Sequence, residues 1–428
     1  GILLKDESWL DFVSSRLPGM LSYTTSKDGY YVDGTFVQHD KITYNGGYGL
    51  MCLTDSAYLV YMLAGTKWAV PKEKSDLIYR WVYENYVPIV ANGLTMDAFR
   101  GREITRYDTT QPRGTLIIAN AMLMLAETAP AETAADFKGY IKSWFSSQFM
   151  VDEMNHGADT PWYKFPLDTV VKVQNILKDS SIQPKDLKGQ MVQMVSGART
   201  VQFRGKYASV LSMTSQTIAN CEIGDSNAKG WYTGNGMLNL YTDDLERSEG
   251  VAKATIDWYR LPGATAVYGK SQASGRFNLN SFTGGVTDGE YGVSGMDLSV
   301  QANSLKAKKS YFFFDDEIVA LGSGISGQGQ IETTLENYML QSGNRSYAVN
   351  GAPQQMVMDG ETVSYEGVST LHMDGNVSGS GIGFYFPNGA DIQTVSGTRT
   401  GKWTDLGEYN TDPAVQSADW FTAWLSHG

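Results

Sequence analysis

The chain has 428 residues, more than one hydrophobic core normally serves, so two domains are expected. Its formal net charge of −12 argues against a nucleic-acid partner, which requires a basic surface, but allows an acidic polysaccharide if the binding surface itself is basic. No apolar run reaches the ~18 residues of a membrane-spanning helix, so no membrane partner is expected.

The first part of the chain, residues 1–165, is predicted to be mainly helical. Residues 6–17 space Trp9, Phe12, Val13 and Leu17 on one face of a helix. Polar, glycine-rich loops separate this segment from similar ones that follow. Helical pairs of this kind predict stacked helical hairpins in a bundle, a solenoid or a toroid. The further predicted helices lie at residues 55–66, 74–87, 113–128 and 131–149.

The pattern changes in the middle of the chain. Residues 151–166 are predicted to be a loop and residues 173–189 a short helix and linker, which places a linker at 166–189. From residue 190 onward the apolar residues alternate with period two, and glycine, serine and asparagine turns separate the segments. The expected second domain, residues 190–428, is a large antiparallel β-sandwich. Its clearest strand segments are residues 201–215, 310–324, 330–340, 361–369 and 381–390.

Residues 33–50, DGTFVQHDKITYNGGYGL, place one of the four histidines nine residues before a tyrosine that lies between glycines. Taken alone, His39 is more often structural and Tyr48 more often a packed ring; Tyr44 is expected to pack. The glycines permit a tight turn or close approach of a ligand, and functional groups concentrate in such loops. The motif predicts that Tyr48 acts as a base, aided by a cation such as Arg102 that favours the phenolate.

A second motif, MDAFRGREITRY at residues 96–107, contains three arginines. If the segment is helical, Arg102 and Arg106 face the same side, and their like charges need an anion nearby. Two interpretations stay open. Either Glu103 or Asp97 supplies that anion in a purely structural arrangement, or the arginines form a fork for the carboxylate of a ligand.

The β-rich half opens with NCEIGDSNAKGWYTGNG at residues 220–236, and RLPGATA follows from residue 260. By themselves, Glu222, Asp225 and Asn227 are typical of a turn cluster.

The remaining composition says less about function. The only cysteines, Cys52 and Cys221, have no CxxC neighbour, and the sequence has no metal-ligand spacing, so no metal and no cofactor are expected. The 25 Tyr and 10 Trp suit sugar binding, but they are equally common in β-rich cores.

Taken in order, these motifs resemble those of polysaccharide lyase family eight, which holds bacterial hyaluronate, chondroitin AC and xanthan lyases. The resemblance extends over nearly all of the 428 residues, with the motifs in the same order. The resemblance implies an α+β multidomain protein: an incomplete (α/α) toroid, then an antiparallel β-sandwich, with a long cleft where they meet. It also implies a secreted protein. The matching stretches are DGTFVQHDKITYNGGYG, RGREITR, NCEIGDSNAKGWYTGNGMLNLYTDDL and YRLPGATA.

The resemblance implies two groups of site residues, in addition to the fold. The catalytic group matches the family's histidine and tyrosine, an arginine near the tyrosine, and an acidic residue of the same network. The substrate-binding group comprises two further arginines and an asparagine. The catalytic residues are His39, Tyr48, Arg102 and Glu222, and the substrate-binding residues are Arg100, Arg106 and Asn227.

Two features of the family pattern are missing. The family's catalytic asparagine lies upstream of the histidine, and residues 1–38 contain no asparagine. The last β domain of the family is also expected to be absent. The chain is therefore expected to be a trimmed piece of a longer protein, or to have a partner chain that supplies the rest of the toroid.

The implied reaction is β-elimination on an acidic polysaccharide with uronate rings, such as hyaluronan or chondroitin, with xanthan as the alternative. His39 helps neutralise the uronate carboxylate, while Tyr48 removes the C5 proton and returns a proton to the leaving oxygen. Two other classes of protein stay open. One is a non-catalytic carbohydrate-binding protein; the other is a glycoside hydrolase with two carboxylates drawn from Asp33, Asp40, Asp97 and Glu103.

Overall fold

The computed structural model describes residues 6–156, 166–271, 278–300, 303–341 and 346–428. Contacts between Cα atoms divide the chain into two compact units. The first unit comprises residues 1–100 and 111–187, and the second comprises residues 101–110 and 188–428. The short segment 101–110 therefore belongs to the second unit, although helical residues flank it on both sides in the sequence. The linker predicted at residues 166–189 stays a prediction.

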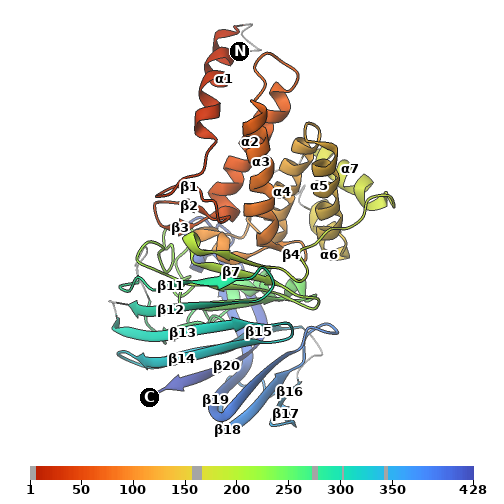
Figure 1. The fold of residues 1–428 in the computed structure, drawn as a ribbon. Helices are drawn as coiled ribbons and strands as arrows, with labels where there is room; N and C mark the ends of the chain where they lie inside the picture. The colour runs from red at the N-terminus through yellow and green to blue at the C-terminus, as the bar shows by residue number, and fades with distance from the viewer. Residues whose placement is uncertain (1–5, 157–165, 272–277, 301–302, 342–345) are drawn as a thin grey trace. The chain divides into compact units, whose positions relative to one another are not determined.

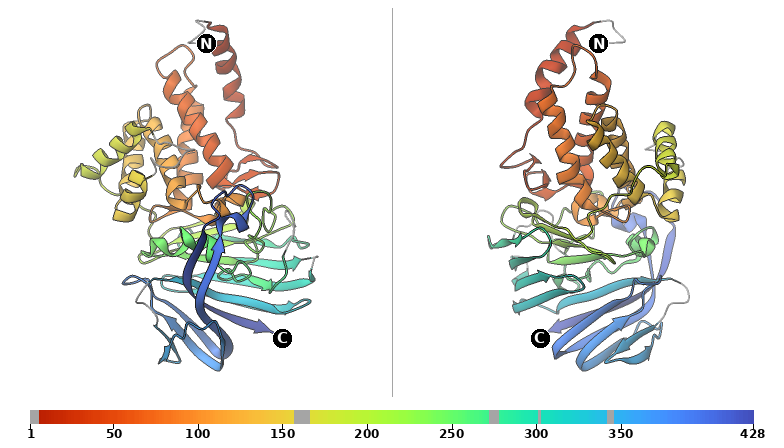
Figure 2. Two further views of the ribbon diagram at one scale, coloured as in Figure 1. Left: turned by 180° about the vertical axis from the view of Figure 1, so that it is seen from behind. Right: turned by 45° about the vertical axis from the view of Figure 1, so that its right-hand side comes forward.

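The first unit is mainly helical (Figures 1 and 2). Helix α4 is central in it, because α2, α5, α6 and α7 all contact it and most of its side chains are buried. The described α-helices are α1 Ser8–Met20, α2 Leu50–Leu63, α3 Lys72–Trp81, α4 Gln111–Ala126, α5 Ala131–Trp144, α6 Gln148–His156 and α7 Leu167–Lys178.

One helix lies where a loop was predicted. Residues 148–156 form α6, so the predicted loop at 151–166 is wrong for its first residues; residues 157–165 lie outside the described residues. Met150 and Met154 explain the helix, since both are buried and they lie four positions apart, on one helical face. A stripe of only two apolar residues is too short to be recognised in the sequence.

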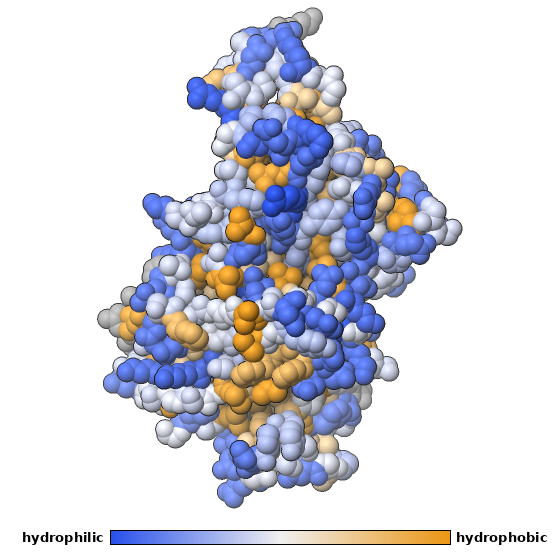
Figure 3. Space-filling model, in the orientation of Figure 1, coloured by the Kyte–Doolittle hydropathy of each residue, from blue (hydrophilic) through white to orange (hydrophobic). Residues whose placement is uncertain are grey.

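Helix α1 forms where it was predicted, but none of its side chains is buried. Trp9 and Phe12 are each 57% exposed, so the expected apolar face is not packed within the described structure. The helix is held instead by polar contacts with the loop after α2, namely an ion pair between Glu7 and Lys67 and a hydrogen bond of 2.7 Å from Trp68 Nε1 to Asp11. Apolar side chains mix with hydrophilic ones over the face drawn in Figure 3.

A small antiparallel sheet lies before α2 in the first unit. Its strands are β1 Gly29–Tyr30, β2 Phe36–Gln38 and β3 Ile42–Thr43. The turn between β2 and β3 carries His39, and the π-helical turn Asn45–Gly49 that leads into α2 carries Tyr48. A second pair of strands, β4 Val90–Ala91 and β5 Leu94–Thr95, precedes the 3-10 turn Asp97–Phe99.

The described residues of the second unit form three sheets in which every strand pair is antiparallel (Figure 1). The first sheet has the order β6 Met191–Met194, β7 Arg199–Phe203, β8 Ala208–Ser212, β9 Met237–Tyr241. The second has the order β11 Thr283–Thr287, β12 Gly292–Val300, β13 Leu305–Phe313, β14 Ile318–Ser326. The third has the order β10 Thr265–Val267, β15 Ile331–Leu340, β20 Val415–His427, β19 Ile382–Lys402, β18 Thr362–Met373, β16 Ser346–Val349, β17 Ala352–Gln355.

The period-two pattern found in the sequence produces these strands. Along β13, Leu305, Ala307, Lys309, Tyr311 and Phe313 are buried, and the residues between them are more exposed. Side chains of the first sheet reach the second directly: Gln193 and Thr200 hydrogen bond with Ser294 at 2.9 and 2.7 Å.

The predicted order of a helical part followed by an antiparallel β-rich part is confirmed. The short helical segments of the second unit include the 3-10 turns Gly101–Thr105 and Trp403–Leu406 and the helix α8 Val251–Thr255. None of the helices in the described parts of the chain combines the length and apolar character needed to cross a bilayer.

Candidate functional site

In the first unit, the structure brings His39 and Tyr48 together. Their ring centroids are 5.1 Å apart, and the planes meet at 72°. Tyr44 completes a triangle of rings, with its centroid 5.1 Å from that of Tyr48 and 6.2 Å from that of His39. Tyr48 is 36% exposed, whereas Tyr44 is fully buried and supports the other two rings, as expected.

The backbone holds His39 in an uncommon conformation. His39 and Asp40 have φ values of 56° and 62°, in the left-handed region, which histidine and aspartate tolerate better than most residues. The carboxylate of Asp28 fixes this turn, because it accepts hydrogen bonds from the Asp40 amide at 2.6 Å and from the side chain of Gln38 at 2.9 Å. The position of the imidazole is therefore set by a turn with its own anchor.

The π-helical turn that carries Tyr48 is anchored at both ends. At its start, buried Asn45 accepts a hydrogen bond from the Phe36 amide at 3.0 Å and donates to the carbonyl groups of Gly34 and Asn85 at 2.8 and 3.0 Å. Single π-helical turns are rare in proteins as a whole, and a large share of them occurs at functional sites.

At the other end of this turn, the Gly49 carbonyl accepts hydrogen bonds from the hydroxyl groups of Tyr30, at 3.1 Å, and Tyr86. Burial raises the pKa of Tyr30 and the pKa of Tyr86 well above the usual value of a phenol, so both stay protonated donors. Tyr48 is thus held by the residue that follows it.

Gly46 must be a glycine for steric reasons. A Cβ atom at this position would lie 2.8 Å from Cγ of Arg100 and 3.2 Å from the Phe99 carbonyl oxygen. Arg100 is only 2% exposed, and its guanidinium donates to Asp97 at 2.8 Å. The aliphatic part of the Arg100 side chain therefore packs against the glycine turn. The predicted role of Arg100 in substrate binding stays a prediction.

In the second unit, Arg102 and Glu222 form a two-point contact. Nη1 of Arg102 donates to Oε1 of Glu222 at 2.9 Å, and the Arg102 backbone amide donates to Oε2 at 2.9 Å. Glu222 is buried, so this charge-assisted pair is shielded from water on the carboxylate side. Two of the sequence motifs therefore meet through these residues.

Arg106 has a different environment from that of Arg102. It lies 3.8 Å from Glu103 and 3.4 Å from the Ser226 hydroxyl, and its guanidinium carbon is 4.3 Å from the centroid of the Tyr409 ring. The segment forms a 3-10 turn at 101–105. Asp97 contacts Arg100 and Glu103 contacts Arg106, whereas Arg102 contacts the distant Glu222. The structural and the ligand-binding interpretation of these arginines both stay predictions.

Asn227 organises the loop that carries Glu222. Its Nδ2 donates to the Glu222 carbonyl at 2.8 Å, and its Oδ1 accepts from the amides of Gly230 and Lys229 at 2.9 and 3.3 Å. The residue is buried. This geometry gives Asn227 a supporting function in the loop, and its predicted contact with substrate stays a prediction.

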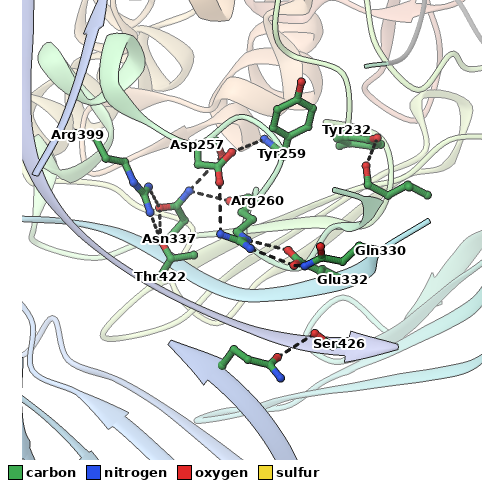
Figure 4. Close-up of polar contacts among 12 residues, drawn as sticks. Tyr232, Asp257, Tyr259, Arg260, Gln330, Glu332, Asn337, Arg399, Thr422 and Ser426 are labelled. Carbon is green, nitrogen blue, oxygen red and sulfur yellow. Dashed lines mark hydrogen bonds and ion pairs between the residues drawn. The ribbon is translucent and has the colours of Figure 1, made fainter. Parts of the chain in front are cut away.

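The RLPGATA motif lies in a buried network of the second unit (Figure 4). Arg260 donates to both carboxylate oxygens of Glu332 at 2.7 and 3.0 Å. Its guanidinium carbon also lies 4.1 and 3.7 Å from the ring centroids of Tyr268 and Trp424. The adjacent Asn337 links the Arg260 carbonyl to the guanidinium of Arg399. The motif therefore stabilises the sheet around β15 and β20.

A segment that no motif covered contacts the arginine turn. The Asn410 side chain donates to the Thr105 carbonyl at 2.9 Å and accepts from the Tyr107 amide at 3.1 Å. None of the sequence motifs includes residues 403–410, and contacts between residues about 300 positions apart leave no local signal in the sequence.

Cys52 and Cys221, both described, form no disulfide. Within the described ranges, no group of three His, Cys, Asp or Glu side chains is placed to hold a metal ion.

The sequence of the chain matches two family profiles. That of "Polysaccharide lyase family 8, N terminal alpha-helical domain" matches residues 1–143, and that of "Polysaccharide lyase family 8, super-sandwich domain" matches residues 192–428. A xanthan lyase of Bacillus sp. (strain GL1) is 39% identical over 436 residues, which cover 100% of this chain and 46% of that protein. A hyaluronate lyase of Thermasporomyces composti is 29% identical over 439 residues, which cover 100% of this chain and 54% of that protein.

Solved structures agree with these matches. The structure of a Paenibacillus xanthan lyase has a TM-score of 0.94 and 36% identity, covering 100% of this chain and 41% of that chain. The structure of the Streptomyces coelicolor A3 chondroitin AC lyase in complex with chondroitin sulphate has a TM-score of 0.86 and 28% identity. The match covers 100% of this chain and 56% of that chain. The chain thus spans about half the length of the relatives it matches. Because the two profiles together match most of its residues, the chain belongs to polysaccharide lyase family 8.

Proposed function

We propose that the protein is a polysaccharide lyase that cleaves an acidic, uronate-containing polysaccharide by β-elimination. The observation that carries the proposal is the pair of His39 and Tyr48 rings, 5.1 Å apart, on two independently anchored turns. An imidazole beside a partly exposed phenol supplies a hydrogen-bond donor and a proton-transfer group without a cofactor. Family membership supports this choice of reaction.

In the proposed reaction, His39 donates a hydrogen bond to the uronate carboxylate, which stabilises the negative charge that grows as the C5 proton leaves. Tyr48 takes that proton as the general base and then protonates the departing glycosidic oxygen as the general acid. The bond from C4 to the glycosidic oxygen breaks as the C4–C5 double bond forms. The product is an unsaturated uronide.

The residues of the second unit have binding roles in this proposal. Arg102, oriented by Glu222, and Arg106 offer guanidinium groups to the acid groups of the polymer. Arg100 and Asn227 are both buried, and we assign them to support of the Gly46 turn and of the Glu222 loop. These assignments rest on the contacts within each unit.

Part of the catalytic machinery comes from outside this chain in the proposal. The resemblance assigns a further amide donor to the reaction, and residues 1–38 contain no asparagine that matches it. We infer that an upstream segment of a longer protein, or a second chain, supplies this group. Secretion is proposed on the resemblance alone.

The candidate polymers are hyaluronan, chondroitin and xanthan, whose lyases share the sequence motifs. Hyaluronan or chondroitin was slightly preferred from the sequence. The identity is higher with a xanthan lyase, at 39%, than with a hyaluronate lyase, at 29%. Xanthan therefore becomes an equal candidate.

The test is an assay of the intact protein on hyaluronan, chondroitin and xanthan that records ultraviolet absorbance of unsaturated products. We expect absorbance to develop with at least one polymer. Tyr48→Phe should lower the rate by ~10²-fold or more, the size of a general acid–base contribution, and leave polymer binding largely intact. Tyr58→Phe, at an exposed tyrosine of α2, is the matched control and should keep wild-type activity.

Three results would contradict the proposal. Cleavage without absorbance would favour a hydrolase. Polymer binding without cleavage, even with an upstream fragment added back, would favour a carbohydrate-binding protein. Wild-type turnover in Tyr48→Phe would remove Tyr48 from the mechanism.

A further inference from the structure

The loop formed by residues 403–410 presents an exposed aromatic ring on one of the candidate arginines. Tyr409 is 56% exposed, and its ring centroid lies 4.3 Å from the guanidinium carbon of Arg106. Both residues belong to the second unit. The ring therefore has a cation on one side and retains a large area in contact with water.

The backbone on both sides of Tyr409 is fixed. The amide of Tyr409 donates to the Asp225 carbonyl at 3.3 Å. The next residue, Asn410, is buried and hydrogen bonds with Thr105, Tyr107 and the Trp403 carbonyl. The exposed ring is therefore carried by a loop that is tied to the arginine turn and to the loop after Glu222.

Tight packing also fixes the residue two positions before the ring. Gly407 has a φ of 155°, and a Cβ atom there would lie 2.5 Å from the Asp225 carbonyl oxygen. In addition, the Ala228 amide donates to the Leu406 carbonyl at 2.7 Å. The loop therefore has little freedom to move away from residues 225–228, and Tyr409 is held in place before any ligand arrives.

An isolated exposed tyrosine needs no explanation, since such residues are common at protein surfaces. Tyr409 differs because its ring is held over the guanidinium of Arg106. Its loop also contacts the segments that carry Arg102 and Glu222, which pair with each other. A tyrosine ring offers a flat apolar face, which suits the C–H face of a sugar, and an arginine binds carboxylates in two-point geometry. Together they match a sugar ring that carries an acid group.

We propose that Tyr409 and Arg106 form a sugar-binding subsite for the acidic polysaccharide. The Tyr409 ring stacks on one sugar, and Arg106 binds the acid group of that sugar or of its neighbour. This inference rests on the proposed function for the choice of ligand. It adds a binding residue, Tyr409, that none of the sequence motifs contains.

The experiment compares Tyr409→Ala, Tyr409→Phe and Tyr409→Trp with the wild type. Binding of hyaluronan, chondroitin and xanthan oligosaccharides is measured by titration calorimetry, and KM and kcat are measured by the absorbance assay. The matched control is Tyr385→Ala, which removes an exposed tyrosine from β19 in the same unit.

We expect Tyr409→Ala to weaken binding about tenfold and to raise KM similarly at nearly unchanged kcat, as loss of one aromatic stacking contact predicts. The Phe and Trp variants should stay within about twofold of the wild type, because the ring face is kept. Tyr385→Ala should bind normally.

Several outcomes would overturn the inference. Normal binding by Tyr409→Ala would show that the ring makes no contact with the polymer. Equal losses in the Ala and Phe variants would show that the hydroxyl, not the ring face, matters. A lower melting temperature together with an equal loss in kcat would show that Tyr409 only holds Arg106.

The subsite and the proposed lyase activity can fail separately. If the wild type forms no unsaturated product from any polymer, even with an upstream fragment added back, the lyase proposal fails. The difference in binding between Tyr409→Ala and Tyr385→Ala then still decides whether the subsite exists.

Discussion

Arg102 and Glu222 are 120 positions apart in the sequence, yet both oxygens of the glutamate accept hydrogen bonds from this one arginine. One bond comes from the guanidinium and the other from the backbone amide, so the carboxylate fixes the direction of the side chain as well as its charge. A guanidinium held in this way loses little further freedom when it binds a second anion.

Glu222→Gln tests this relationship. The amide can accept only one of the two hydrogen bonds and carries no charge, so we expect an activity loss of ~10-fold or more and a stability loss of about 1–3 kcal/mol. Turnover and thermal unfolding measure the two effects. Glu246→Gln, at a glutamate in the 3-10 turn 245–248, serves as the control. Unchanged turnover in Glu222→Gln would show that the pair is only structural.

Arg102→Ala should lower activity more than Arg106→Ala. Arg102 is oriented by Glu222, whereas Arg106 lies beside Glu103 and under the Tyr409 ring, so its charge is already partly balanced. We expect Arg102→Ala to reduce kcat, and Arg106→Ala mainly to raise KM. Steady-state kinetics with each polymer distinguish these effects. Equal and small losses in both variants would favour a purely structural arrangement of arginines.

Gly46→Ala should destabilise the first unit. Its added methyl group meets Cγ of Arg100 at 2.8 Å, and overpacking of this kind costs about 1–3 kcal/mol. Because the Gly46 turn carries Tyr48, activity should fall as well. Gly19→Ala in α1 is the matched substitution, since nothing lies within 4 Å of its new Cβ atom. Equal melting temperatures of the two variants would contradict the prediction.

The buried amine of Lys309 predicts a pH dependence of stability. Burial lowers its pKa to about 7, and its ammonium donates to the carbonyl groups of Asn235 and Gly263. An unfolded lysine has a pKa of about 10.4, so between about pH 7 and pH 10 the unfolded chain binds more protons than the folded chain. Stability should therefore rise with pH across this window.

The test compares the melting temperatures of the wild type and Lys309→Met from about pH 6 to about pH 10. This range includes the folded pKa of about 7 and extends most of the way to the unfolded pKa of about 10.4. As the pH rises, the melting temperature of the wild type should increase relative to that of Lys309→Met. His427 and Tyr311, which lie near the amine, are common to both proteins. Lys308→Met changes the exposed neighbour on β13 and should follow the wild type. Parallel curves for all three proteins would contradict the low pKa.

The sequence was sufficient for the order of the two parts and for most strands, because period-two and helical patterns are local. It failed at α6, where only Met150 and Met154 mark the buried face. It also placed Trp9 and Phe12 on one helical face correctly but could not show that this face would be exposed.

For the candidate site, the short spacing and the glycines paired His39 with Tyr48, because only a turn, the strand β3 and the start of the π-helical turn lie between them. Spacing could not show that Arg102 has Glu222 as its partner, or that Tyr409 covers Arg106, because these contacts join distant parts of the chain. Residue type and family pattern assigned Arg100 and Asn227 to substrate binding, and this assignment stays a prediction. The sequence could not show that both side chains are buried.

The segment 101–110 has a practical consequence for anyone who cuts this protein into pieces. By sequence it lies inside the helical half, so a fragment starting at residue 190 would seem to be a complete β domain. Such a fragment would lack Arg102, Thr105 and Tyr107, which contact Glu222, Ser226 and Asn410 in the second unit. The polypeptide must therefore be kept whole across residue 190, or the missing decapeptide must be added back, before the isolated sheets are judged for sugar binding.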